Sequence, residues 1–305
     1  MINHLPLKLA VIGNCQVGGI ASALKVLLPD SEIVAWHVGT SPITKEDIWA
    51  KLPEYDVVIS GIIDSEQGET FDRRRLEERC ARTVFMLPVV FTGFHPDCVY
   101  IGHGGQPISG VVGPYHSAII AAAFSLGLPP ERVPRLFNAL VYSKLGYLDA
   151  FAAAKRAFLE EHRNYGFDLA DHFERWVAAD SFMHTINHPR IDVLSTLATL
   201  MAVRAGLIGD EKPIPTAVVD DLERHQQWPI YPEIAATIGI TASMTFLRSV
   251  NDLKQDQSRE VELGEAIRAS YDTTRSCRTW TFLLGGSGLS ATDLVRCWGR
   301  PPPGS

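Results

Sequence analysis

Residues 7–19 read LKLAVIGNCQVGG, and this stretch decides how the N-terminal part of the chain is expected to fold. Its first seven residues form a short apolar run that ends in glycine, which is typical of a buried strand. The segment 16–28 that follows carries apolar residues at helical spacing. The pattern therefore predicts a strand, a tight turn at Asn14-Cys15-Gln16, and a helix.

The same alternation of strand and helix signals continues to about residue 125. Strands are expected at 32–38, 56–63, 83–90 and 98–101, and helices at 44–52 and 70–80. Repeated strand–helix units predict a parallel sheet with flanking helices, as in flavodoxin-like α/β folds. The continuous apolar character of the strands fits burial on both faces of that sheet.

The pattern changes near Gly113, and most of the remaining chain gives helical signals. Helices are expected at 116–126, 144–162, 169–179, 189–205, 216–225, 231–247 and 258–273. The sequence thus divides into an α/β core at 1–125, which carries the Asn-Cys-Gln turn, and a mainly helical region at 126–295 that completes the site. The proline-rich end, 296–305, is expected to be a disordered tail.

Composition and charge narrow the class of protein. The 305 residues carry a formal net charge of −7, and 46% of them are hydrophobic. An acidic chain with one short basic run does not fit a general nucleic-acid binder. No stretch has the roughly 20 apolar residues that span a bilayer, and the N-terminus lacks the features of a signal peptide.

The cysteines indicate a reducing compartment. There are five of them, scattered and without a Cys-x-x-Cys pair. This is neither a disulfide framework nor a zinc site, so we expect a cytoplasmic protein without a metal. The cysteines are Cys15, Cys80, Cys98, Cys277 and Cys297.

The turn after the first strand is the first place to look for a site, because ligands of open parallel sheets bind beyond the carboxyl ends of the strands. The turn lacks the Lys and Ser/Thr of a P-loop and the Gly-x-Gly of a dinucleotide fingerprint. It places Cys15 at a helix N-terminus, where the helix dipole is expected to lower the thiol pKa and where backbone N–H groups can hold an oxyanion. Asn14 and Gln16 add amide donors. The alternative is a buried cysteine that acts as a small hydrophobe.

A cysteine nucleophile needs a base, and the segment FMHTINHP at 182–189 offers two. Pro189 suits the first position of the next helix, with Asn187 or His188 at its cap. His188 and His184 are therefore base candidates, and the alternative is that one of them only caps the helix. Two histidines four apart also permit a metal site, but no third ligand is evident.

Weaker signals occur elsewhere. His95-Pro96-Asp97 and His103-Gly104-Gly105 both follow strand signals. Candidates for contact with substrate or oxyanion include Gly61, near the end of the third expected strand, and Tyr115 and His116, which are expected to open a helix. The run Arg73-Arg74-Arg75 is either a solvated helix face or a phosphate site.

Three motifs together resemble a known family. They are Gly13-Asn14-Cys15-Gln16 after a strand, GPYHS at 113–117, and the histidine segment ahead of a late helix. The chain resembles the WcbI-type acetyltransferases of capsular polysaccharide biosynthesis over roughly residues 7–210. This resemblance implies coenzyme A or acetyl-CoA as a substrate and O-acetylation of a capsular sugar.

The resemblance also implies a distant similarity to the SGNH (GDSL) hydrolase fold. There a nucleophile follows the first strand, and a histidine lies shortly before the last helix. Cys15 then takes the nucleophile position, and His184 or His188 takes the base position. Two departures leave the oxyanion donors and the third catalytic residue open. The segment from Gly61 to Asp64 lacks the family's Asn, and Asp180 precedes His184 by four residues instead of three.

Three functions remain open at this point. The first is acetyl transfer from acetyl-CoA to a sugar hydroxyl, either through an acetylated Cys15 or by direct attack of a hydroxyl that the histidine deprotonates. The second is an SGNH-like esterase that removes acyl groups from carbohydrates. The third is a non-catalytic module that binds CoA or a nucleotide sugar. The residues expected to contact the CoA phosphates are Arg73, Arg74, Arg75 and Lys144.

Overall fold

The structure is a computed structural model, and it divides the chain into two compact units. The first unit holds residues 1–90, 159–182 and 187–222, and the second holds 91–158, 183–186 and 223–305. Each unit is therefore made of segments that are separated along the sequence. The residues described are 6–38, 42–61, 71, 73–103, 106–214, 218–276 and 281–285, with the backbone alone at 276 and 281–285.

Some predicted features lie outside the described residues. These are the tail at 296–305, the pair Gly104-Gly105, residues 62–64 after Gly61, and the cysteines Cys277 and Cys297.

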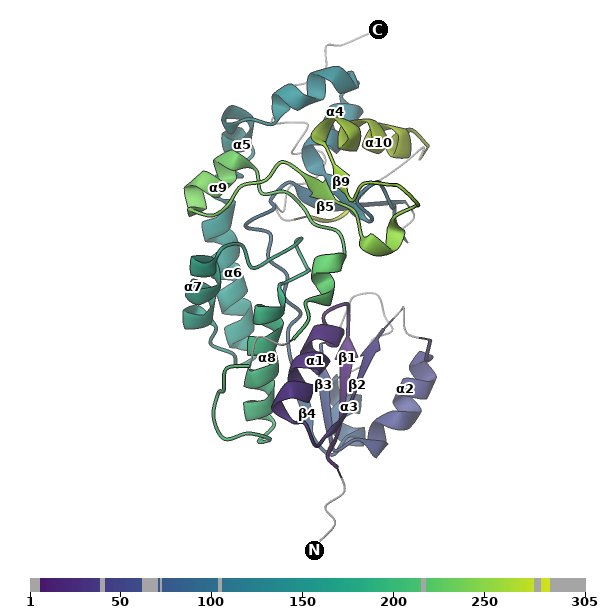
Figure 1. The fold of residues 1–305 in the computed structure, drawn as a ribbon, viewed down its shortest axis with the longest axis vertical. Helices are drawn as coiled ribbons and strands as arrows, with labels where there is room; N and C mark the ends of the chain where they lie inside the picture. The colour runs from purple at the N-terminus through teal and green to yellow at the C-terminus, as the bar shows by residue number, and fades with distance from the viewer. Residues whose placement is uncertain are drawn as a thin grey trace, which may run out of the picture. The chain divides into compact units, whose positions relative to one another are not determined.

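The first unit is built on a parallel sheet of four strands in the order β2-β1-β3-β4 (Figure 1). The strands are β1 (Lys8–Gly13), β2 (Glu32–His37), β3 (Val57–Ser60) and β4 (Thr83–Phe85). Helices α1 (Val17–Leu27), α2 (Lys45–Lys51) and α3 (Arg73–Arg79) alternate with them, and the short 3₁₀ helix η1 (Leu52–Glu54) follows α2. The predicted parallel α/β fold is confirmed.

Both faces of this sheet are covered. Trp49, Leu52 and Phe71 are buried in one cluster with Ala10 and Ile12 of the central strand. Helix α1 packs against α8 (Ile191–Arg204), which lies beside it in Figure 1. Burial on both faces explains why the strands read as continuous apolar runs.

The first turn of α1 carries two glycines with different surroundings, and one of them allows the close α1–α8 contact. A Cβ on Gly19 would lie 2.5 Å from Leu194 Cδ1 and 3.2 Å from Ile191 Cδ1, whereas a Cβ on Gly18 would meet nothing within 4 Å. Since Leu194 is itself buried, its side chain has little room to give way. The second glycine therefore fixes how closely α8 approaches α1.

These two glycines give a matched pair of substitutions. We expect Gly19→Ala to lower the free energy of unfolding by about 1–3 kcal/mol through overpacking. Gly18→Ala should raise it by about 0.5–1 kcal/mol, because alanine restricts the unfolded chain and favours the helix. Urea denaturation of both variants measures the difference. Equal effects of the two substitutions would show that the α1–α8 contact is looser than described.

The second unit contains an antiparallel sheet. Strand β5 (Cys98–His103) pairs antiparallel with β6 (Gln106–Pro107), β7 (Tyr115–Ser117) and β10 (Thr281–Gly285). The expectation that residues 98–101 extend the parallel sheet was therefore wrong. A parallel neighbour needs a crossover connection, usually a helix, and the connection from β4 to β5 contains none.

The rest of the chain is mainly helical, as predicted, but with different bounds. Residues 144–162 are divided between α5 (Ala139–Lys144) and α6 (Ala150–Asn164), with Gly146 between them at φ +74. Residues 231–247 are helical only in α9 (Pro232–Ile238), which ends at Gly239 in the left-handed region, and the last two residues of this range form a strand. The other helices are α4 (Ala118–Ser125), α7 (Ala170–Ala179), α10 (Leu263–Ser276), and the 3₁₀ helices η2 (Pro130–Leu136), η3 (Asp221–Arg224) and η4 (Val250–Asp252).

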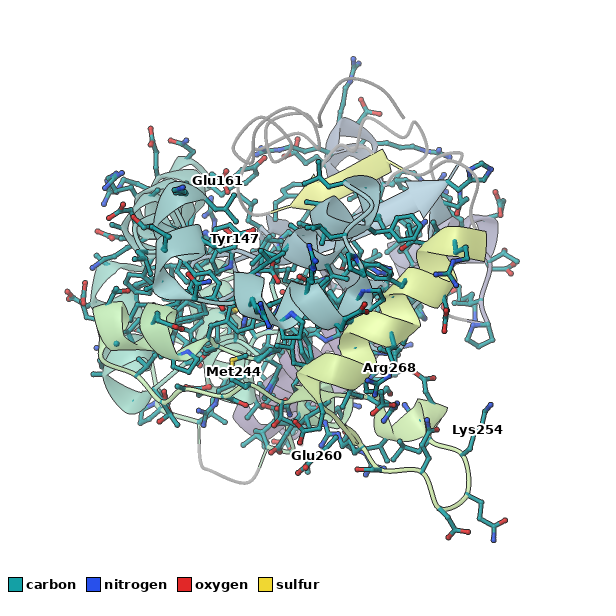
Figure 2. The ribbon with its side chains drawn as sticks, turned by 90° about the horizontal axis from the view of Figure 1, so that it is seen from above. Tyr147, Glu161, Met244, Lys254, Glu260 and Arg268 are labelled. Atoms are coloured by element: carbon teal, nitrogen blue, oxygen red, sulfur yellow. The ribbon has the colours of Figure 1, made fainter. Side chains whose placement is uncertain are left out.

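A small hairpin-like pair, β8 (Phe246–Leu247) with β9 (Glu260–Val261), is connected through η4 and an exposed loop. Figure 2 shows Lys254 pointing outward from this loop. Among the helices that the structure describes, none combines the length and the apolar character that a membrane crossing requires.

Candidate active site

The turn after β1 is tight and locally bonded. The Asn14 side-chain oxygen accepts a hydrogen bond from the Gln16 N–H at 3.1 Å, and the Asn14 carbonyl accepts one from the Val17 N–H at 3.2 Å. A Cβ on Gly13 would lie only 2.9 Å from Val17 Cγ1, so the strand turns directly into the helix. Cys15 is thereby held at the carboxyl end of the central strand, at the start of α1.

The Cys15 thiol does not have the lowered pKa that its position predicted. Burial raises its pKa to about 11, and the Cys15 backbone amide opposes this only in part. The loss of hydration around the thiolate therefore outweighs the favourable helix N-terminus. The resting group is a thiol, and a nucleophilic role requires a base that takes its proton.

This raised pKa predicts how Cys15 reacts with an alkylating reagent. We expect the rate with iodoacetamide to rise about tenfold per pH unit from pH 7 to pH 10, because the thiolate fraction rises in that proportion below the pKa. Mass spectrometry of the Cys15 peptide measures the rate, with the buried Cys80 as an internal reference. A rate that levels off below pH 8 would show that the thiolate is already formed.

The Gln16 side chain connects three segments of the first unit. It is fully buried. Its Nε2 donates to the carbonyls of Val89, at 2.9 Å, and Asn187, at 3.0 Å, while its Oε1 accepts from the Val89 N–H at 3.0 Å. The amide hydrogens are thus both used inside the protein, and these contacts support a structural role for Gln16 instead of donation to a substrate.

This connection brings the histidine segment to the cysteine turn. His188 is buried and directly follows Asn187, whose carbonyl Gln16 holds. Gly61 also lies near the carboxyl end of β1, because its N–H donates to the Ile12 carbonyl at 2.7 Å. The sequence pattern indicates these residues only separately, whereas the Gln16 contacts join positions that lie far apart in the chain.

The helix after His188 begins later than expected. Helix α8 starts at Ile191 with Arg190 as its N-cap, so neither His188 nor Asn187 caps it, and Pro189 is not its first residue. The Ile191 N–H instead donates to the Asp220 carboxylate at 2.9 Å. Since another residue caps the helix, capping is not the role of His188.

Four of the other predicted residues belong to the second unit. His184 accepts a hydrogen bond from the Trp228 N–H at its carbonyl. Tyr115 and His116 lie in β7, not in a helix as predicted, since the α4 N-cap is Ser117. Lys144 is exposed at the end of α5.

The two β7 residues are bonded within their unit. The Tyr115 hydroxyl accepts from Thr185 Oγ1 at 3.2 Å, and burial raises its pKa well above the usual value. His116 Nε2 lies 2.8 Å from the Ile108 carbonyl, and burial lowers the pKa of its ring. A neutral His116 with a proton on Nε2 satisfies that contact.

The three arginines of α3 have local partners in the first unit. Arg73 and Arg74 form exposed ion pairs with Glu77 and Glu78, one turn further along the helix. The Arg75 guanidinium lies 4.2 Å from the centre of the Trp49 ring. Contacts of this exposed kind contribute little to stability and exchange readily.

A second cluster, not recognised from the sequence, surrounds Asp97 in the second unit. Its fully buried carboxylate accepts from the Tyr231 hydroxyl at 2.7 Å, the Tyr147 hydroxyl at 3.4 Å and the Ile119 N–H at 2.9 Å. Burial raises the Asp97 pKa to about 6. Figure 2 shows Tyr147 among the packed side chains. The His95-Pro96-Asp97 motif marked the place, but the tyrosines come from distant segments.

Asp97 and the neighbouring His95 should affect the pH dependence of stability in opposite directions. The folded Asp97 binds its proton more tightly than the unfolded chain between its ordinary pKa of 3.8 and about 6, so its contribution falls as pH rises through that window. Burial lowers the His95 pKa from 6.5 to about 4, so the unfolded chain binds that proton and the contribution of His95 rises over nearly the same range.

Removing one group should therefore expose the effect of the other. In Asp97→Asn we expect the free energy of unfolding to rise more steeply between pH 4 and pH 6.5 than in the wild type, and in His95→Gln less steeply. Urea denaturation at both pH values measures the slopes. Slopes that do not differ among the three proteins would contradict these pKa directions.

The described residues include no group of three or more His, Cys, Asp or Glu side chains that could hold a metal ion. The candidate site of the first unit consists of Cys15, the buried Gln16 amide and His188, near the carboxyl end of β1.

These features define an α/β protein with a candidate site around Cys15, at the end of its first strand. The chain belongs to the WcbI family, whose model is described as polysaccharide biosynthesis enzyme WcbI and matches residues 8–209. The matched segment includes both the Cys15 turn and the His188 segment. The protein is accordingly a polysaccharide biosynthesis enzyme by family.

The other comparisons add little. No curated protein matches the chain. Among solved structures, a metal-free mutant of a periplasmic metal-binding protein from Candidatus Liberibacter asiaticus is 11% identical and covers 88% of this chain and 98% of its own, with a TM-score of 0.21. A TM-score this low carries no argument about fold or function.

Proposed function

We propose that the protein transfers an acetyl group from acetyl-CoA to a hydroxyl of a sugar used in polysaccharide biosynthesis. The family supplies the polysaccharide context. The observation that carries the proposal is the buried Gln16 amide, which ties the segment preceding His188 to the turn that presents Cys15. A cysteine and a histidine on two connected segments are the pair that acyl transfer needs.

In the covalent route, His188 takes the proton of the Cys15 thiol, and the sulfur attacks the acetyl carbonyl of acetyl-CoA. The bond between that carbonyl and the CoA sulfur breaks, and CoA leaves as a thiol after it gains a proton. The sugar hydroxyl then attacks the acetylated Cys15, loses its proton to His188, and restores the thiol. Because donor and intermediate are both thioesters, the first step is nearly balanced in free energy.

In the direct route, His188 takes the proton of the sugar hydroxyl, whose oxygen attacks acetyl-CoA without an acetylated enzyme. Cys15 then lines the position of the reacting carbonyl. The raised pKa of Cys15 is compatible with both routes, since a neutral thiol needs the base in the first and stays protonated in the second. Ping-pong kinetics would distinguish the covalent route.

His188 is the base that we propose, because its segment is tied to Cys15 within one unit. Arg73, Arg74 and Arg75, which all belong to the first unit, keep their proposed role toward the CoA phosphates, whereas Lys144 belongs to the second unit and is not included in this site. Arg73 and Arg74 would exchange the carboxylates of Glu77 and Glu78 for phosphate oxygens. An acetyl-CoA donor also fits the cytoplasmic location expected from the sequence.

Calorimetric titration of CoA and acetyl-CoA tests the donor. We expect micromolar or tighter binding to the wild type and similar binding to Cys15→Ser, because the thiol is not proposed to hold the nucleotide. The absence of heat with a well-folded wild type would overturn the transferase proposal. Acetate release from an acetylated sugar without CoA would then identify an esterase.

A further inference from the structure

A cavity of about 660 Å³ lies in the first unit, and all of its lining residues belong to that unit. Its walls come from one face of α7, one face of α8 and residues 211–214 with Val218. The volume falls within the range of about 300–1,000 Å³ that is usual for small-molecule sites. The cavity is large enough for a sugar, and neither Cys15 nor His188 is among its lining residues.

One wall carries a polar relay. His172 Nε2 lies 3.0 Å from the Glu211 carboxylate, and the Arg175 guanidinium donates to His172 Nδ1 at 2.6 Å. Because Nδ1 accepts from Arg175, the ring is neutral and its proton is on Nε2, where it is donated to Glu211. Burial also lowers the pKa of His172. Arg175 thus faces a neutral partner in the ring.

Both carboxylates of the cavity lining have a neighbouring side chain as partner. The Glu211 carboxylate is held by His172, and Asp192 lies 3.8 Å from the Arg190 guanidinium. Arg175 and Lys212 supply the cationic groups of the lining. A guanidinium is suited to bidentate bonding of a carboxylate or phosphate.

The remaining lining residues are mostly aliphatic or carry hydroxyls. Ile191, Pro213 and Ile214, here called the aliphatic wall, line the cavity together with Ser195. Among the described residues that line the cavity, none is Phe, Tyr or Trp. A nucleobase would find no such ring to stack on, whereas the C–H face of a sugar ring needs only an aliphatic surface.

Helix α8 relates the cavity to the candidate site, because it supplies lining residues and also packs against α1. Ile191 lines the cavity and also lies close to Gly19 of α1. The first turn of α1, which contains Gly19, comes shortly after Cys15 in the chain. Helix α8, which supplies this wall, begins three residues after His188. A ligand in the cavity is therefore held by the helix that continues the histidine segment.

We propose that this cavity binds a sugar that carries a carboxylate or phosphate group, and that this sugar is the acetyl acceptor. Arg175 and Lys212 hold the anionic group, and the aliphatic wall contacts the ring. The role as acceptor rests on the proposed function, whereas the binding of an anionic sugar does not.

Calorimetric titration of the full-length protein with glucuronic acid, glucose 1-phosphate and glucose, without acetyl-CoA, tests the binding. We expect at least one anionic sugar to bind at least tenfold more tightly than glucose, and the two probes distinguish carboxylate from phosphate. Arg175→Gln should weaken that binding at least tenfold, and Arg175→Lys less. Arg163→Gln, an exposed arginine of α6 outside the cavity, is the matched control and should bind as the wild type does.

Three results would overturn the proposal. They are failure of both anionic sugars to bind, unchanged affinity in a folded Arg175→Gln, and displacement of the sugar by CoA in direct competition. Thermal unfolding of each variant shows whether it is folded. Lys212→Gln gives an independent test, because Lys212 is the other cationic residue of the lining. Because no acetyl donor is present, binding can succeed while acetyl transfer fails, so the two proposals are separable.

Discussion

Replacing Cys15 by alanine is expected to lower kcat for acetyl transfer by at least about 10³-fold, because loss of a nucleophile removes a covalent step that the remaining groups replace poorly. Acetyl transfer to the sugar, followed with labelled acetyl-CoA, measures the change. The thiol is half-buried at the carboxyl end of β1, with a pKa of about 11, so its substitution removes no charge from the resting protein. We therefore expect the fold and the binding of CoA to persist.

Cys80→Ala is the matched control. This cysteine lies in the same unit but is buried in the core cluster with Trp49 and Leu76. Its loss should cost some stability and leave kcat nearly unchanged. Wild-type turnover in Cys15→Ala would remove the cysteine from the mechanism. A loss of less than about tenfold would favour the direct route, in which Cys15 only lines the site.

The second large effect is expected for Gln16→Leu. The substitution leaves the Val89 N–H, the Val89 carbonyl and the Asn187 carbonyl without their partner. Unsatisfied buried groups cost about 1–3 kcal/mol each, so with three such groups we expect the free energy of unfolding to fall by at least about 3 kcal/mol. Urea denaturation measures this loss.

The same variant tests whether Gln16 positions the histidine segment. If the amide sets the approach of His188 to Cys15, kcat should fall by about 10²-fold, because small displacements of reacting groups have effects of that size. KM for acetyl-CoA should change little. Leu52→Ala, a truncation in the core of the same unit that costs about 2–5 kcal/mol, is the control. A similar fall of kcat in both variants would assign the effect to lost stability alone.

The fold of the first unit was predictable because its signals are local. Apolar runs and helical spacing placed β1, α1, β2 and α2 within one or two residues of the described bounds. These elements follow one another with short connections, and their order implies a parallel sheet. The predicted Asn14-Cys15-Gln16 turn is present between β1 and α1.

The second unit was less predictable because its pairing depends on distant segments. Strand β5 pairs with β10, which lies far along the chain, and no periodicity in residues 98–101 indicates that partner. Gly146 and Gly239 adopt left-handed conformations that end helical segments, and they divide two patterns that looked continuous. A glycine within a helical pattern is only a weak signal of such an end.

The candidate site, like the second unit, was only partly predictable, because it depends on contacts between distant segments. The sequence identified Cys15, Gln16 and the histidine segment but gave no means to assign their roles. The desolvation that raises the Cys15 pKa depends on the packing around the turn, and the role of Gln16 depends on carbonyls far along the chain. Asp97 was noted only as part of a short motif, because its tyrosine partners are far away in the sequence.

The most direct test of the central claim is the acetyl transfer reaction itself. The wild type, Cys15→Ala and His188→Asn are each mixed with acetyl-CoA labelled on the acetyl group and with a panel of neutral and anionic sugars. The label in the sugar and the free CoA are measured together. We predict that the wild type releases CoA in step with acetylated sugar and that both variants are at least about 10²-fold slower. Label that appears in no sugar, or transfer at the wild-type rate in both variants, would contradict the assignment of this site to acetyl transfer.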